Sequence, residues 1–164
     1  MKVNRLSELA FLSALSLIIF IIEINIPNPF PVPGVKLGLA NIITVYAVFR
    51  YRPYETVLVV AVRLILGSML CSSFSALIFS AAGALCCLTG MILLSGIISE
   101  DNIWLCSIIG AALHNIGQTA AAILVMNSIA VVWYLPFLLI AGTLAGMFTG
   151  LCAQFLMKRL HKRI

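Results

Sequence analysis

Six long apolar segments, separated by short polar breaks, follow one another along this chain of 164 residues. Hydrophobic residues make up 63% of the sequence and charged residues only 9%, and the mean hydropathy is +1.17. A water-soluble domain of this size carries roughly a quarter charged residues. The sequence therefore predicts an all-α integral membrane protein. No polar linker is long enough to separate two domains, so we expect a single domain over residues 1–164.

The apolar segments have the lengths expected of membrane-spanning helices. Such a helix needs about 20 residues, or fewer where flanking side chains reach back to the interface. Between the first two segments, four prolines fall within residues 27–33 and exclude a helix there. Pro53 marks a further break. The sequence thus predicts a bundle of six transmembrane helices, at residues 6–26, 36–50, 55–70, 74–98, 103–126 and 133–157.

The basic residues indicate how the helices are oriented. With six spans, Lys36 falls on one side of the membrane, and the other flanking Lys and Arg residues fall on the opposite side. Because Lys-rich and Arg-rich flanks stay in the cytoplasm, both termini are predicted to be cytoplasmic, in a multi-pass protein of the plasma membrane. The same clustering accounts for the net charge of +5 without nucleic acid as a partner. We expect the basic tail to contact membrane lipid. The residues on the cytoplasmic side are Lys2, Arg5, Arg50, Arg52, Lys158, Arg159, Lys162 and Arg163.

Arg63 lies in the middle of an apolar segment, with no acidic residue within seven positions on either side. A charge at mid-bilayer depth is costly, so it usually faces the bundle interior, a cavity or a partner. A guanidinium can hold a carboxylate or a phosphate through two parallel hydrogen bonds. Arg63 is therefore a candidate ligand for an acidic small-molecule substrate. The alternative is a structural arginine that bonds helix-end carbonyls or reaches out to the interface.

A second polar spot lies at a similar depth in the segment 103–126. His114 and Gln118 are four residues apart and share one face of a helix, whereas Asn115 is turned about 100° away. The three side chains offer donors and acceptors suited to a polar substrate. The alternative is a network of hydrogen bonds between helices, and for Asn115 in particular a packing role.

Lys36 and Asn41 lie at the outer end of the predicted second helix, beside the proline-rich loop. At its depth, Asn41 should point into the bundle, where it is a candidate substrate ligand. Lys36 is a candidate ligand too, although it could instead pair with Glu23 at the outer end of the first helix. No second histidine or carboxylate is placed to complete a metal site, so we expect neither a metal nor another cofactor.

Four blocks of the sequence resemble a family of small membrane proteins that carries two names, Gx transporter and heptaprenyl diphosphate synthase component I. The blocks are PGVKLGLAN at 33–41, RLILG at 63–67, FSAAG at 79–83 and GAALHNIGQ at 110–118. The architecture of this family is similar to that of the substrate-binding S components of energy-coupling factor transporters. The resemblance implies six helices and a substrate held toward the outer half of the bundle.

The resemblance also implies where partner proteins bind. In S components, an Ala-xxx-Ala pair on the first helix packs on the transmembrane coupling subunit. In this chain that role falls on Ala10 and Ala14. Small side chains there would leave a groove for a partner helix. No nucleotide-binding loop is present in the sequence, so ATPase subunits would have to supply the energy for uptake.

The two family names predict different activities. A prenyl diphosphate synthase holds the diphosphate of its substrate through Mg²⁺, which needs a cluster of carboxylates. The chain has one aspartate and four glutamates, and they form no cluster in the sequence. We therefore expect no catalytic residues, and a substrate-binding subunit of an energy-coupling factor importer for a small polar or anionic solute. The alternative is an accessory subunit of heptaprenyl diphosphate or quinone-precursor synthesis, non-catalytic on its own.

Overall fold

The computed structural model describes residues 3–26, 38–70 and 74–161. These residues form six α-helices, two short 3-10 helices and no strand, which confirms the predicted all-α class. The α-helices are α1 (Val3–Asn25), α2 (Asn41–Arg50), α3 (Pro53–Leu70), α4 (Phe74–Ser95), α5 (Ile103–Met126) and α6 (Leu135–His161). The 3-10 helices are η1 (Glu100–Asn102), before α5, and η2 (Ile129–Tyr134), before α6.

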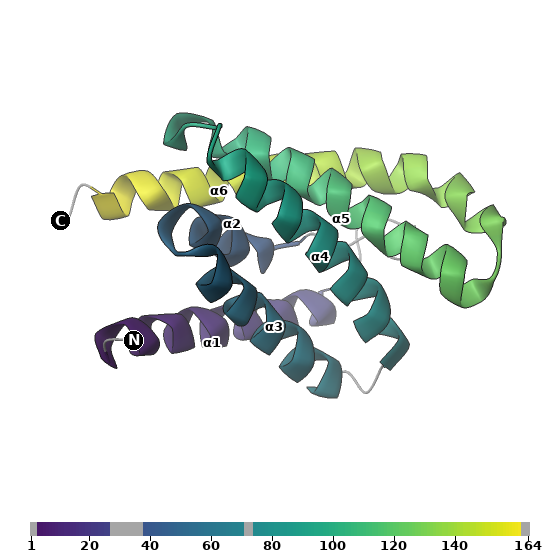
Figure 1. The fold of residues 1–164 in the computed structure, drawn as a ribbon, viewed down its shortest axis with the longest axis horizontal. Helices are drawn as coiled ribbons and strands as arrows, with labels where there is room; N and C mark the ends of the chain where they lie inside the picture. Colours follow the sequence, from purple (N-terminus) through teal and green to yellow (C-terminus); the bar gives the residue numbers. More distant parts are fainter. Residues whose placement is uncertain (1–2, 27–37, 71–73, 162–164) are drawn as a thin grey trace.

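Five segments of the described part of the chain are long and apolar enough to cross a membrane, and α2 is not among them. With 10 residues, α2 is about 15 Å long, half the thickness of a hydrocarbon core. The predicted second span, 36–50, is therefore too long at its start: Gly38 has a left-handed φ of 71°, and the helix begins at Asn41. Lys36 lies outside the described residues. The start of α1 and the end of α6 lie toward the same side of the molecule (Figure 1).

Helices α4, α5 and α6 pack side by side, with α5 in the middle (Figure 1). Glycines allow these backbones to approach closely. A Cβ atom on Gly150 of α6 would lie 2.6 Å from the Cα of Trp104 on α5, and one on Gly117 of α5 would lie 2.8 Å from the carbonyl oxygen of Ala82 on α4. The hydroxyl groups of Ser107 and Thr149 meet between α5 and α6, 3.1 Å apart. Small residues thus bring the three helices into contact, as is common in lipid.

Helix α1 packs against two helices, α3 and α2, and lies away from the layer formed by α4, α5 and α6. Arg5 of α1 holds the carboxylate of Glu55 on α3 through two hydrogen bonds, from Nε at 2.9 Å and from an Nη at 2.8 Å. The backbone N–H of Arg52 donates a third hydrogen bond to Glu55, at 2.9 Å. The Arg5 guanidinium also lies 5.0 Å from the ring centre of Tyr51. These contacts fix the start of α1 against the turn between α2 and α3.

Candidate functional site

Arg63 lies on the inner face of α3 and is only 7% exposed. Its guanidinium donates hydrogen bonds to three side chains: the Ser16 hydroxyl at 3.4 Å, the Thr44 hydroxyl at 3.3 Å and the Asn41 side-chain oxygen at 3.4 Å. Ser16 belongs to α1, and the other two belong to the first turn of α2. Three helices therefore converge on this one cation.

The partners of Arg63 form only weak hydrogen bonds with its guanidinium, and none of them carries a negative charge to balance it. All three acceptors are neutral, and the distances of 3.3–3.4 Å are longer than usual for N–H···O bonds. Within the described part of the chain, no carboxylate lies within salt-bridge distance of Arg63. A buried charge is costly unless it is paired with an opposite charge. A carboxylate or phosphate brought to this position would complete the interaction.

Glu23, near the end of α1, is the acidic residue whose charge acts on Arg63 at longer range. The Glu23 side chain is 8% exposed, and its oxygens accept hydrogen bonds from the backbone N–H groups of Gly38 and Ala40. A negative charge is favourable at the N-terminus of a helix, and here it lies at the start of α2. The suggested pair between Lys36 and Glu23 falls outside the described residues.

His114 and Arg63 both approach α4. A Cβ atom on Gly83 of α4 would lie 2.9 Å from the His114 ring, so the imidazole packs against that glycine. Cys87, one helical turn farther along α4, lies near Arg63. Gly83 and Cys87 lie on one face of α4, because they are four residues apart. Gln118 is half-buried, one turn beyond His114 on α5. A shared cavity between Arg63 and His114 stays a prediction.

Asn115 points to α6. Its side-chain N–H donates a hydrogen bond to the carbonyl oxygen of Leu138 at 2.6 Å. Gly142 makes room for it, since a Cβ atom there would clash with the Asn115 side-chain nitrogen. This contact favours the packing role for Asn115 over substrate binding.

Ala10 and Ala14 are exposed on α1. The buried positions of the helix, including Leu9, Leu12 and Ser16, face the bundle instead. The face with the two alanines is therefore available to a partner.

Two of the residues that bind Arg63, Ser16 and Thr44, were not predicted from the sequence. Neither carried a signal, because hydroxyl side chains in apolar helices commonly bond their own backbone. The described residues also contain no group of three or more His, Cys, Asp or Glu side chains that could hold a metal ion.

Comparison with known proteins identifies the family but no individual relative. No curated protein and no solved structure that was compared with the chain matches it. The family model of heptaprenyl diphosphate synthase component I matches residues 12–156, which is most of the chain and includes Arg63 and His114. The likeness to S components stays a prediction. The match confirms the family resemblance, and the chain belongs to the heptaprenyl diphosphate synthase component I family.

Proposed function

We propose that this chain is the substrate-binding membrane subunit of an energy-coupling factor type importer, which captures a small anionic solute from outside. The observation that supports this proposal is the hydrogen bonding of Arg63. It is a buried cation on α3 that α1 and α2 contact only through long hydrogen bonds to neutral side chains. A purely structural arginine would be expected to have a carboxylate partner or short bonds to backbone carbonyls.

In the proposed complex, a carboxylate or phosphate of the solute accepts hydrogen bonds from the Arg63 guanidinium. Asn41 and Thr44 then orient the guanidinium from the side of α2, and Ser16 does so from α1. His114 and Gln118 supply a second polar surface, from α5. The affinity for an anion follows from the buried position of Arg63, because a charge-assisted bond is stronger where water is excluded.

The proposed coupling subunit packs on Ala10 and Ala14 of α1, whose exposure supports this assignment. Replacing either alanine by Trp should leave solute binding intact and stop uptake, because the partner helix can no longer approach. The matched control is Ile24→Trp, an exposed position at the other end of α1. Loss of solute binding together with uptake, or normal uptake in both alanine variants, would count against this docking surface.

The family match favours a second candidate function, an accessory membrane subunit of heptaprenyl diphosphate synthesis. In that role the chain binds a prenyl synthase and the synthase carries the catalytic residues. Arg63 would then be a structural residue, or it would bind the diphosphate of a prenyl substrate.

Co-purification distinguishes the two candidate functions. The tagged full-length chain is purified from membranes in mild detergent, and both its protein partners and its retained small molecules are identified by mass spectrometry. ATPase and coupling subunits together with a small anion support the importer. A soluble prenyl synthase as the sole partner, with no retained solute, overturns it in favour of the second candidate.

A further inference from the structure

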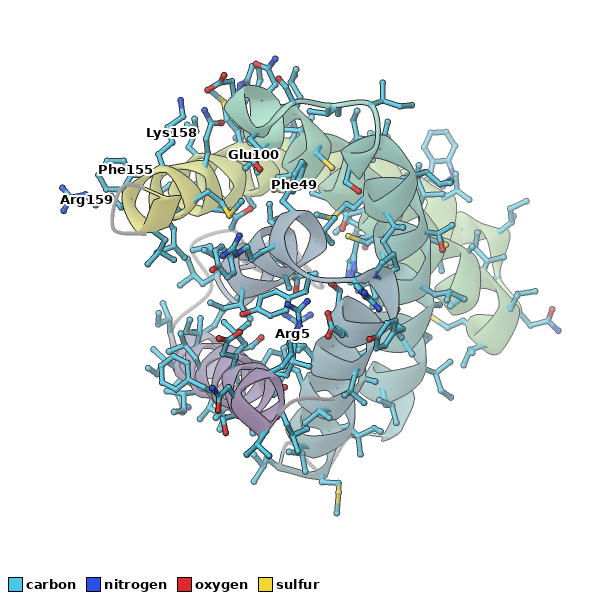
Figure 2. The ribbon with its side chains drawn as sticks, turned by 60° about the vertical axis from the view of Figure 1, so that its left-hand side comes forward. Arg5, Phe49, Glu100, Phe155, Lys158 and Arg159 are labelled. Carbon is cyan, nitrogen blue, oxygen red and sulfur yellow. The ribbon has the colours of Figure 1, made fainter. Side chains whose placement is uncertain are left out.

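A groove of about 390 Å³ lies between α1, α2 and α6. It is on the other side of α2 from Asn41 and Thr44, the two residues of that helix that bind Arg63. Figure 2 shows α1 and α6 on either side of α2. Helix α1 packs mainly on α3, and α6 mainly on α5, so α2 forms the floor that joins the two walls. The volume falls within the range of small-molecule sites, roughly 300–1,000 Å³. Its apolar walls include Phe11, Leu12 and Leu15 of α1, Ile43 of α2, and Met157 and Leu160 of α6.

The groove has one polar end and one apolar end. Helices α1 and α2 run in opposite directions, because Glu8 near the start of α1 accepts a hydrogen bond from Tyr51, which follows the end of α2. The polar lining residues Glu8, Arg50 and Tyr51 therefore gather at one end. Leu15 lies two helical turns deeper, about 10 Å along α1. This arrangement matches an amphiphile, with its head group at the polar end and its hydrocarbon chain inside.

The dimensions of the groove favour a hydrocarbon chain over a partner helix. A helix about 10 Å across fills roughly 400 Å³ for each turn, so the groove has space for about one turn. At the rim, Phe11 is 67% exposed and Leu160 is 41% exposed, so the groove opens toward the surrounding lipid. A flexible chain can enter from the bilayer through such an opening.

The polar end carries a cation that is available to a phosphate group. Arg50 is exposed and, within the described residues, forms no ion pair. The opposing charge, Glu8, accepts a hydrogen bond from the Tyr51 hydroxyl at 3.1 Å, and nearby Arg5 is already paired with Glu55. Basic pockets between helices on the cytoplasmic side attract anionic lipid head groups. We propose that this groove binds one anionic phospholipid, with its phosphate at Arg50 and one acyl chain between α1 and α6.

The test compares lipid binding in variants that differ at one position. The full-length protein is stripped of lipid in detergent, mixed with phosphatidylglycerol or phosphatidylcholine, and examined by native mass spectrometry. Wild type should retain one phosphatidylglycerol in preference to phosphatidylcholine. Arg50→Glu should weaken that binding about tenfold, because it reverses the charge beside the phosphate. The matched control, Arg52→Glu, makes the same charge change two residues away, where the side chain does not line the groove.

A second pair of variants tests the position of the acyl chain. Leu15→Trp fills the groove and should reduce phosphatidylglycerol retention, whereas Ile18→Trp adds the same bulk to the exposed face of α1 and should not. Equal retention across each pair, or equal retention of both lipids by wild type, overturns the proposal. Preferential binding of a polyprenyl phosphate added at equal concentration overturns it too. Solute binding, measured in parallel, should be unchanged in all four variants, so this result is separate from the proposed import function.

Discussion

Arg5 and Arg63 both link α1 to α3, yet the groups that surround the two guanidinium groups differ. Arg5 meets the carboxylate of Glu55 through two hydrogen bonds of 2.9 and 2.8 Å. Arg63 meets only neutral side chains, at 3.3–3.4 Å. The first arginine has a complete partner within the fold. The second is buried with its charge unpaired by any described residue. We therefore expect Arg5 to stabilise the fold and propose a ligand-binding role for Arg63.

The largest expected effect comes from removing the second cation. Arg63→Ala should weaken binding of the anionic solute by more than about 100-fold, since it deletes two charge-assisted hydrogen bonds. The folded protein should persist, because the partners of Arg63 are neutral and leave no buried charge behind. Affinity is measured by titration calorimetry with the solute identified on the purified protein. Arg5→Ala is the control and should bind normally; unchanged affinity in Arg63→Ala would remove this residue from the site.

For the stability of the fold, we expect the two variants to rank in the opposite order. Arg5→Ala leaves the Glu55 carboxylate buried with only a backbone donor, so it should lower the midpoint of thermal unfolding more than Arg63→Ala does. The double variant Arg5→Ala/Glu55→Gln should recover part of the loss, because it removes the unpaired charge. Unfolding is followed in detergent by differential scanning fluorimetry. Equal midpoints for the two single variants would erase the distinction drawn between the arginines.

A smaller effect is expected from Glu23, whose charge partly offsets that of Arg63. Glu23→Gln keeps one side-chain oxygen, for the backbone N–H of Gly38, and loses the long 3.5 Å bond from Ala40 together with the negative charge. Affinity for the anionic solute should rise about fivefold, which corresponds to roughly 1 kcal/mol of relieved repulsion. The same titration measures it. Weaker binding in Glu23→Gln would show that Glu23 supports the solute rather than competing with it.

The smallest effect is expected at Tyr51, beside Arg5. Burial and the hydrogen bond to Glu8 raise the pKa of Tyr51 from 10.0 to about 12. Between these values the unfolded chain loses the phenol proton while the folded protein keeps it, so stability should fall as the pH rises from 10 toward 12. Tyr51→Phe should lose less than about 1 kcal/mol at neutral pH and show a shallower decline above pH 10. Unfolding midpoints of both proteins at a series of pH values test this; parallel curves would contradict it.

The sequence predicts the long helices well and the contacts between helices poorly. The predicted bounds of α5, 103–126, agree with the structure, since Asn127 adopts the left-handed conformation just after a continuous apolar segment. The predicted start of α2 is wrong, because the backbone turns at Gly38 within an otherwise apolar stretch. The pair Arg5–Glu55 joins residues 50 positions apart, and no local pattern indicates it.

For the candidate site, the sequence identifies the charged residue in the apolar segment, Arg63, and not the side chains around it. Arg63 stands out because charge is rare in an apolar segment. Asn41 accepts a hydrogen bond from Arg63, and substrate binding by the two residues stays a prediction. Ser16 and Thr44 escape notice because a hydroxyl in a membrane helix has many possible partners. The direction of Asn115 toward α6 depends on Gly142, a residue 27 positions away. The two residues meet only because α5 packs on α6, which no local sequence pattern indicates.

Helix α1 carries the two exposed alanines and also Ser16, which contacts Arg63 only two residues beyond Ala14. A rigid helix transmits displacement along its axis, so any tilt of α1 imposed at the alanines would shift the Ser16 hydroxyl relative to the guanidinium. Thermodynamic linkage then requires reciprocity: the factor by which the docked protein changes the affinity for the solute equals the factor by which the solute changes the affinity for that protein.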